Sequence, residues 1–156
     1  MAYWRLHYHL VWATHERHPW LQGDIERMVY GTLLGKAEEL GAIIHQIGNT
    51  DDHIHVVASI PPKFAVAECV RHFKGASSRY VNTHAELDFR FKWQNGYGAI
   101  SFGERSMGTV SAYVRDQRQR HARRTTTAYY ERMTEEDVGP DLVGPPQARK
   151  PAAETD

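Results

Sequence analysis

Hydrophobic and polar residues alternate near the start of the chain, over residues 4–14. The apolar members of this alternation are Leu6, Tyr8, Leu10 and Trp12. A period of two residues predicts a strand with one face buried. Over residues 24–40 the apolar positions recur instead every three or four residues, which predicts an amphipathic helix. Gly41 follows this pattern directly and is expected to end the helix.

Two further apolar runs, residues 42–48 and 53–60, are separated by the turn-forming sequence Asn-Thr-Asp-Asp. Both runs are rich in β-branched residues, and the second stops at a pair of prolines, so they predict a hairpin. Side chains two positions apart on a strand share a face. We therefore expect Ile54, Val56 and Ala58 to point together into the core.

The remaining chain predicts a helix over residues 65–82, a strand over 97–102 and a helix over 106–124. The resulting order is β-α-β-β-α-β-α. Such an order fits the α+β class, with a single domain built on a mainly antiparallel sheet and packed helices.

Charge is distributed unevenly along a chain whose formal net charge is zero. Up to Arg124 there are 16 Lys and Arg against 12 Asp and Glu, whereas from Thr125 onward there are 3 against 7. We therefore expect a basic domain over residues 1–124 and an acidic, Pro-containing extension over 125–156, largely disordered from 139. A basic body suits a phosphate backbone, although any one of its arginines could equally belong to a solvated helix face.

The chain has a single cysteine, Cys69, which excludes an internal disulfide. No apolar stretch approaches the ~18 to 20 residues of a membrane span. The first apolar run is interrupted by Arg5 and two histidines, which is unlike a signal peptide. We expect a cytoplasmic protein without a membrane partner.

The first candidate site residues are His53 and His55. On a strand they share one face, and two neighbouring imidazoles on a rigid strand form half of a metal site. The alternative is a His-x-His pair on a solvated face, and the same pattern occurs at His7 and His9.

The second candidate pair is Tyr113 and Gln117, which stand four residues apart within the last predicted helix and so share a face. An amide oxygen is a hard ligand suited to Mg²⁺ or Mn²⁺. Two histidines and one amide leave positions open for phosphodiester oxygens. Alternatively, Tyr113 is a packing aromatic on an amphipathic helix.

Five segments in this order resemble the HUH-type single-tyrosine transposases (TnpA) of insertion sequences that move as single-stranded DNA. The resemblance covers roughly residues 3–122. The segments are Tyr8-His-Leu-Val-Trp-Ala-Thr14, Asp52-His-Ile-His55 with Pro61-Pro62, Phe73-Lys-Gly-Ala-Ser-Ser78, Trp93-Gln-Asn-Gly-Tyr-Gly-Ala99 and Tyr113-Val-Arg-Asp-Gln117.

The resemblance implies the ferredoxin-like (RRM-like) HUH fold, with His53, His55 and Gln117 holding Mg²⁺ or Mn²⁺ and Tyr113 as the nucleophile. The enzyme would cleave and rejoin single-stranded DNA at hairpin-marked element ends through a 5′-phosphotyrosine intermediate. The family also implies a homodimer with composite active sites. It assigns His9 to the opening strand, where a structural role and a DNA contact both stay open.

By position in the family, Arg17, Lys74, Arg79 and Arg118 are expected to contact DNA. Two alternatives keep the fold and change the function. One is a domesticated relative that binds or nicks hairpins, and the other is a non-catalytic RNA- or metal-binding regulator, which would not need Tyr113 and Gln117 in register. The sequence does not identify the base that deprotonates Tyr113.

Overall fold

A four-stranded antiparallel sheet forms the centre of the fold. The structure is a computed structural model and describes residues 2–133. The strands are β1 (His7–Ala13), β2 (Ile43–Asn49), β3 (His53–Ser59) and β4 (Gly98–Phe102). They lie in the order β2-β3-β1-β4. All three strand pairings are antiparallel, which confirms the predicted α+β class and sheet type.

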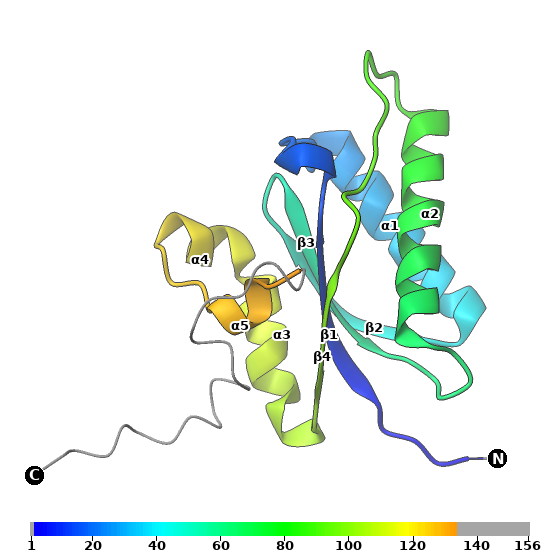
Figure 1. Cartoon of the computed structure of the whole chain (residues 1–156), viewed down its shortest axis with the longest axis vertical. Helices are drawn as coiled ribbons and strands as arrows, with labels where there is room; N and C mark the ends of the chain where they lie inside the picture. The colour runs from blue at the N-terminus through cyan, green and yellow to red at the C-terminus, as the bar shows by residue number, and fades with distance from the viewer. Residues whose placement is uncertain (1, 134–156) are drawn as a thin grey trace, which may run out of the picture.

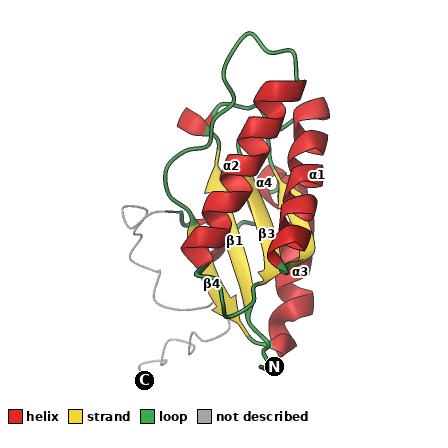
Figure 2. Ribbon diagram, turned by 90° about the vertical axis from the view of Figure 1, so that its right-hand side faces the viewer, coloured by secondary structure: helices red, strands yellow, loops and turns green. Residues whose placement is uncertain are grey.

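Helices cover both faces of this sheet, in two layers (Figures 1 and 2). One layer consists of α1 (Gly23–Leu40) and α2 (Val66–His84), and the other contains α3 (Met107–Arg115) and α5 (Ala128–Glu131). The short elements are the 3-10 turns η1 (His15–Arg17) and η2 (Glu104–Ser106) and the helix α4 (Gln117–Ala122). The sheet therefore separates two environments.

Alternation along β3 decides which side chains enter each environment. Ile54, Val56 and Ala58 belong to the large core beneath α1 and α2, as predicted. Val57 faces the other way and packs against α3 in a second, smaller core. His53 and His55 share that second face because they stand at even spacing from Val57. All seven residues of β3 are buried, so the strand offers a rigid support.

The predicted boundaries of α1 and of the β2–β3 hairpin are confirmed to within one residue. Gly41 adopts a left-handed conformation, with φ of 71°, and its N–H bonds the carbonyls of Ala37 and Glu38. This is the geometry in which glycine ends a helix without a Cβ clash.

The prediction of one continuous helix over residues 106–124 is wrong. The helix α3 ends at Arg115, and α4 begins at Gln117 after a non-helical Asp116 with φ of −94° and ψ of 23°. The break redirects α4 toward the β2–β3 turn. There Arg118 donates to the Asp51 carboxylate at 2.6 Å and to Glu26 at 2.9 Å. These tertiary ion pairs, which are partly exposed, accompany the break and connect the start of α4 to α1 and to the β2–β3 turn.

The first part of the expected C-terminal extension is packed against the sheet. Tyr130 is buried and belongs to the same small core as Val57 and Tyr113. The disorder expected from residue 139 onward concerns residues outside the described part of the chain. Among the described residues, none of the helices has the length and apolar character needed to cross a bilayer.

Candidate active site

The two strand histidines are buried side by side beneath α3 and α5. His53 is 3% exposed and His55 is fully buried. Their rings lie 5.1 Å apart, centroid to centroid. Each ring uses Nδ1 for a partner behind it: His55 Nδ1 lies 2.7 Å from His9 Nε2, and His53 Nδ1 lies 2.7 Å from the Asp52 carboxylate. Both Nε2 atoms are thereby directed toward the same space.

Two residues absent from the predicted set also face this space, His121 at the end of α4 and Glu131 at the end of α5. His121 Nε2 lies 3.1 Å from His53 Nε2. The Glu131 carboxylate lies 3.3 Å from His53 Nε2 and 3.0 Å from His55 Nε2. Potential ligand atoms of all four residues lie within 4.8 Å of one another. Three imidazoles and a carboxylate are a suitable donor set for a divalent transition ion.

One atom at this cluster is left without a hydrogen bond. His55 Nε2 is buried and makes none, although the Glu131 carboxylate lies close to it. A buried nitrogen without a partner costs free energy, roughly 1–3 kcal/mol. An ion bound between the imidazoles would satisfy this nitrogen, so the residues present fit a metal.

The third predicted ligand, Gln117, lies at the border of the same cluster. Its side chain is fully buried. The amide nitrogen donates to the Tyr113 carbonyl at 2.9 Å, and the amide oxygen lies 3.1 Å from His121 Nε2. The structure therefore brings Gln117 close to His53 and His55, with His121 between them.

Tyr113 reaches the cluster from α3. Its ring lies 6.0 Å from that of His55, and only 3% of the residue is exposed. The hydroxyl donates to Glu131 Oε1 at 2.7 Å and accepts a bond from the Thr127 backbone N–H at 2.9 Å. The Arg120 guanidinium lies over the ring, 4.7 Å from its centroid. The predicted nucleophile and the predicted ligands thus meet within one chain.

A close approach between α3 and β2 determines how deeply Tyr113 lies. A Cβ atom on Gly48 would stand 1.6 Å from the Val114 carbonyl oxygen. The helix can therefore rest directly on the strand backbone only because residue 48 is glycine.

The ionisable groups of the cluster influence each other strongly. Burial and the Glu131 carboxylate raise the pKa of Tyr113 well above its usual range. Burial would also raise the pKa of Glu131, but the close contacts with His53 and His55 outweigh it and hold that pKa far below its usual range. In this arrangement the tyrosine is protonated and the carboxylate is charged.

The histidines divide into two groups. Burial lowers the pKa of His55 and, together with the nearby His55, that of His9. Burial is also the largest influence lowering the pKa of His121. For His53 burial is outweighed by hydrogen bonds to Asp52 and Glu131, and the pKa is raised. Most of these rings are therefore neutral and able to bind a cation at neutral pH.

The four predicted DNA contacts do not form one surface. Arg17 lies at the edge of the cluster, 3.5 Å from the Asp52 carboxylate. Lys74 donates to the carbonyls of Gln94 and Gly96, and Arg118 is held by Asp51 and Glu26.

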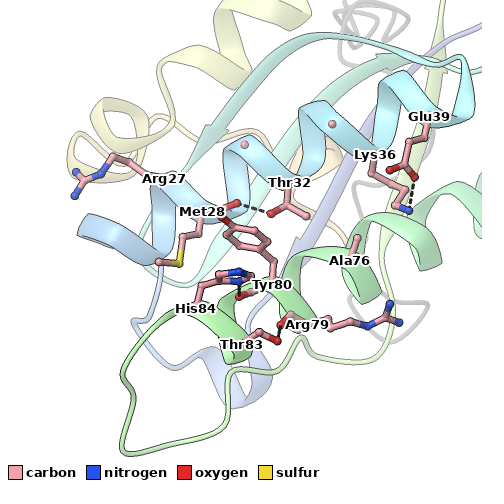
Figure 3. A pocket seen from close by; sticks show the side chains of 12 residues that line it. Arg27, Met28, Thr32, Lys36, Glu39, Ala76, Arg79, Tyr80, Thr83 and His84 are labelled. Carbon is pink, nitrogen blue, oxygen red and sulfur yellow. Dashed lines mark hydrogen bonds and ion pairs between the residues drawn. The ribbon is translucent and has the colours of Figure 1, made fainter.

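Arg79, which is on α2 like Lys74, lines a groove of about 860 Å³ between α1 and α2 (Figure 3). The helices that line it, α1 and α2, lie on the opposite side of the sheet from α3, which carries Tyr113 (Figure 1). Its lining includes Lys36 and a stacked pair of rings, Tyr80 and His84, whose centroids are 4.0 Å apart.

Comparison with known proteins identifies the family to which the chain is similar. Residues 2–117 match the family model described as "Transposase IS200 like". The chain is 26% identical over 119 residues to the ISDra2 transposase TnpA of Deinococcus radiodurans, covering 73% of this chain and 85% of that protein. It is 28% identical over 119 residues to the transposase for insertion sequence element IS200 of Salmonella typhimurium, covering 73% and 78%.

A solved structure agrees with the fold. The REP-associated tyrosine transposase, in its structure bound to a REP hairpin, superposes with a TM-score of 0.61 at 11% identity. The match covers 96% of this chain and 98% of that one. His121 and Glu131 lie beyond the segment that matches the family model.

Proposed function

The chain belongs to the family of IS200-like transposases, and from this premise we propose that it cuts and rejoins single-stranded DNA through Tyr113. The observation that carries the proposal is the position of the Tyr113 hydroxyl, which contacts the carboxylate that itself contacts His53 and His55. A packing aromatic would have no need of this polar environment.

In the proposed reaction the Tyr113 oxygen attacks the phosphorus of a phosphodiester. A bond from phosphorus to the tyrosine oxygen forms, and the bond to the 3′ oxygen breaks. The products are a 5′-phosphotyrosine link and a free 3′-hydroxyl, so the phosphoester is conserved and can be returned to another strand. The hydroxyl proton of Tyr113 points at Glu131 before reaction. Because the hydroxyl is also covered by the Thr127 backbone, the segment at Thr127 must move aside before DNA can approach.

The metal is expected to be bound by His53, His55 and Gln117, and the geometry supports adding His121 and Glu131 to this set. A bound Mg²⁺ or Mn²⁺ would neutralise charge on the phosphate and stabilise the departing oxygen. The protein residues orient this site: Asp52 and His9 fix the two strand imidazoles.

For the DNA partner, we propose single-stranded DNA carrying hairpins, as the name of the REP-bound relative suggests. Arg79 is the predicted contact that the structure favours, because it shares its groove with Lys36 and an exposed aromatic pair. Aromatic faces beside basic groups suit nucleic acid. Lys74 and Arg118 already bind carbonyl and carboxylate oxygens of this protein, so DNA would have to compete with those contacts or add to them. The homodimer with composite sites stays a prediction, and Tyr113 is paired here with His55 of its own chain.

The proposal is tested with labelled single-stranded hairpin oligonucleotides that include the DNA flanking the gene. The protein is incubated with Mn²⁺, Mg²⁺ or chelator, and a denaturing gel reports DNA-linked protein. We expect a metal-dependent covalent band that disappears in Tyr113→Phe and in His55→Ala.

The matched control is Tyr3→Phe, a change at a tyrosine that is 90% exposed. This variant should form the band as the unchanged protein does. Hairpin binding without any band would favour the domesticated relative. Binding of RNA alone would favour the regulator. A band that survives Tyr113→Phe would refute the nucleophile.

A further inference from the structure

A chain of hydrogen bonds ties the start of the tyrosine helix to the first strand. Glu104 is the first residue of η2, which runs directly into α3. Its carboxylate accepts a hydrogen bond from His7 Nε2 at 2.8 Å and pairs with the Arg5 guanidinium. Both partners belong to the N-terminal segment, so side chains far away in the sequence hold the turn that leads to Tyr113.

The series of hydrogen bonds continues from His7 across the sheet. His7 Nδ1 lies 2.7 Å from the Ser59 hydroxyl, which lies 2.6 Å from His45 Nε2. When neutral His7 donates from Nε2 to Glu104, its Nδ1 can only accept, so Ser59 donates to it and His45 donates to Ser59. Every bond in the series then points toward Glu104. His7 and Ser59 are buried, with 4% and 3% exposure, so this part of the chain is shielded from water.

The Glu104 carboxylate, at the end of this series of hydrogen bonds, is charged. Hydrogen bonds from Arg5 and then His7 lower the pKa of Glu104 to about 2. The pair with Arg5 is open to solvent, with both side chains about half exposed, and such pairs contribute little. The directional contact that matters is the one from buried His7.

Apolar packing alone would leave the position of α3 less well defined. Val110 and Val114 pack against Val57, and contacts of this kind have no preferred direction. Between Glu104 and Ala112, within the described chain, Glu104 is the residue whose side chain forms polar bonds to the sheet side of the molecule. It therefore supplies what the apolar contacts lack, a fixed starting point for the helix.

We propose that Glu104, held by His7 and Arg5, is a positioning residue for Tyr113. By fixing where α3 begins, it sets the place at which the Tyr113 hydroxyl meets the phosphodiester. A displacement of about 1 Å in a reacting group can reduce a rate on the order of 100-fold. The inference rests on the proposed nucleophilic role of Tyr113.

The test compares Glu104→Ala with Glu104→Gln in the full chain. We expect Glu104→Ala to lower the single-turnover rate of covalent DNA attachment about 10- to 100-fold. KM for the hairpin oligonucleotide and affinity for Mn²⁺ should stay within about twofold, because the cluster itself is unchanged. The Gln variant keeps an oxygen that accepts from His7 Nε2, so it should recover most of the rate. Glu38→Ala, a change at an exposed carboxylate on α1, is the matched control and should behave as the unchanged protein.

Hydrogen exchange gives a second readout that does not depend on activity. The amides of η2 and α3 should exchange faster in Glu104→Ala and at the normal rate in Glu104→Gln. Three results would overturn the proposal: an unchanged rate in Glu104→Ala, a Gln variant as slow as the Ala variant, or losses of Mn²⁺ affinity that match the loss of rate. If the unchanged protein forms no covalent product at all, the proposed function fails, and faster exchange in Glu104→Ala would then report an anchor of the helix without a catalytic role.

Discussion

At the level of single residues, the orientation of His53 and His55, the proposed metal ligands, depends on the residues that hydrogen-bond to their Nδ1 atoms. Asp52 holds His53, and a neutral imidazole, His9, holds His55. A carboxylate behind a ligating imidazole fixes the ring and makes its free nitrogen more basic. The two supports are therefore chemically different, and their removal should have measurable effects on metal binding.

Asp52→Asn is expected to lower the affinity for Mn²⁺ about 10- to 100-fold, as is usual for a partner behind a metal ligand. Isothermal titration calorimetry with Mn²⁺ measures this directly. Asp51→Asn is the matched control because Asp51 pairs with Arg118 and touches no imidazole. Equal losses in the two variants would contradict an orienting role for Asp52.

Metal affinity should also rise with pH. Hydrogen bonds to Asp52 and Glu131 outweigh burial and raise the pKa of His53, so as the pH falls a proton occupies this ring and must leave before an ion binds. Below that pKa the affinity should increase by about tenfold per pH unit, and it should level off above it. Titrations with Mn²⁺ from pH 6 to pH 8 test this, and a flat profile would mean that His53 carries no proton to lose. In Asp52→Asn the rise should move to lower pH, because the first of the two supporting hydrogen bonds is weakened.

Residue spacing predicted part of this cluster. His53 and His55 followed from strand alternation, and Tyr113 with Gln117 from helical spacing, and the structure brings all four together. His121 continues the same four-residue spacing beyond Gln117, a signal that was available in the sequence. Glu131 had none, because it reaches the cluster through tertiary packing of a segment whose composition predicts only an acidic extension.

At the level of elements, the position of α3 depends on two attachments. One is Glu104 in η2, directly before the helix, and the other is Gly48 of β2, where the backbones of helix and strand meet. Tyr113 lies beside the second attachment. A small displacement of β2 at Gly48 should therefore also displace the Tyr113 hydroxyl.

Gly48→Ala should destabilise the protein by about 1–3 kcal/mol, because the new methyl group overlaps the Val114 carbonyl. Gly35→Ala is the contrasting change, since a Cβ there meets nothing within 4 Å. On a helix it should be neutral or stabilising by up to about 1 kcal/mol. Thermal unfolding of both variants measures the difference. Similar melting temperatures would mean that the helix shifts without cost.

Elements with a strong repeating pattern were predicted well, including α1 with its terminal Gly41 and the β2–β3 hairpin. The break at Asp116 was not. The local sequence there has no proline or glycine, and the residues that follow the break contact other elements, as Arg118 does with Asp51 and Glu26. Such long-range ion pairs leave no periodic signal in the sequence.

At the level of the whole molecule, the sheet divides two kinds of surface. The tyrosine and the histidine cluster lie with α3 and α5, whereas the groove with Arg79 lies between α1 and α2 on the other side. The order of elements was predicted from the sequence, and so was the antiparallel sheet. The residue at which the folded unit ends was not predicted, because Tyr130 and Glu131, which belong to the expected extension, pack at the centre of the site.

Two truncations test where the folded unit ends. A chain ending at Met133 keeps α5 and should match the full chain in Mn²⁺ affinity. A chain ending at Arg124 loses Glu131 and the Tyr130 ring, and we expect its Mn²⁺ affinity to fall at least about tenfold, because a proposed ligand is lost. Calorimetry on both, with circular dichroism to verify folding, distinguishes them. Equal Mn²⁺ affinities of the two truncated proteins would mean that residues 125–133 are not needed for metal binding, as the boundary at residue 124 predicts.

The crowding of imidazoles at one point has a practical consequence for the choice of ion. If three histidines and a carboxylate within 4.8 Å hold the ion as proposed, the site would by the general order of affinities bind Ni²⁺, Cu²⁺ and Zn²⁺ more tightly than Mn²⁺. Protein recovered from a nickel column or from a zinc-rich medium would then carry an ion that Mg²⁺ cannot displace. The metal ions available in the cell, rather than the relative affinities of the site, would then decide what fraction of the transposase carries Mg²⁺ or Mn²⁺.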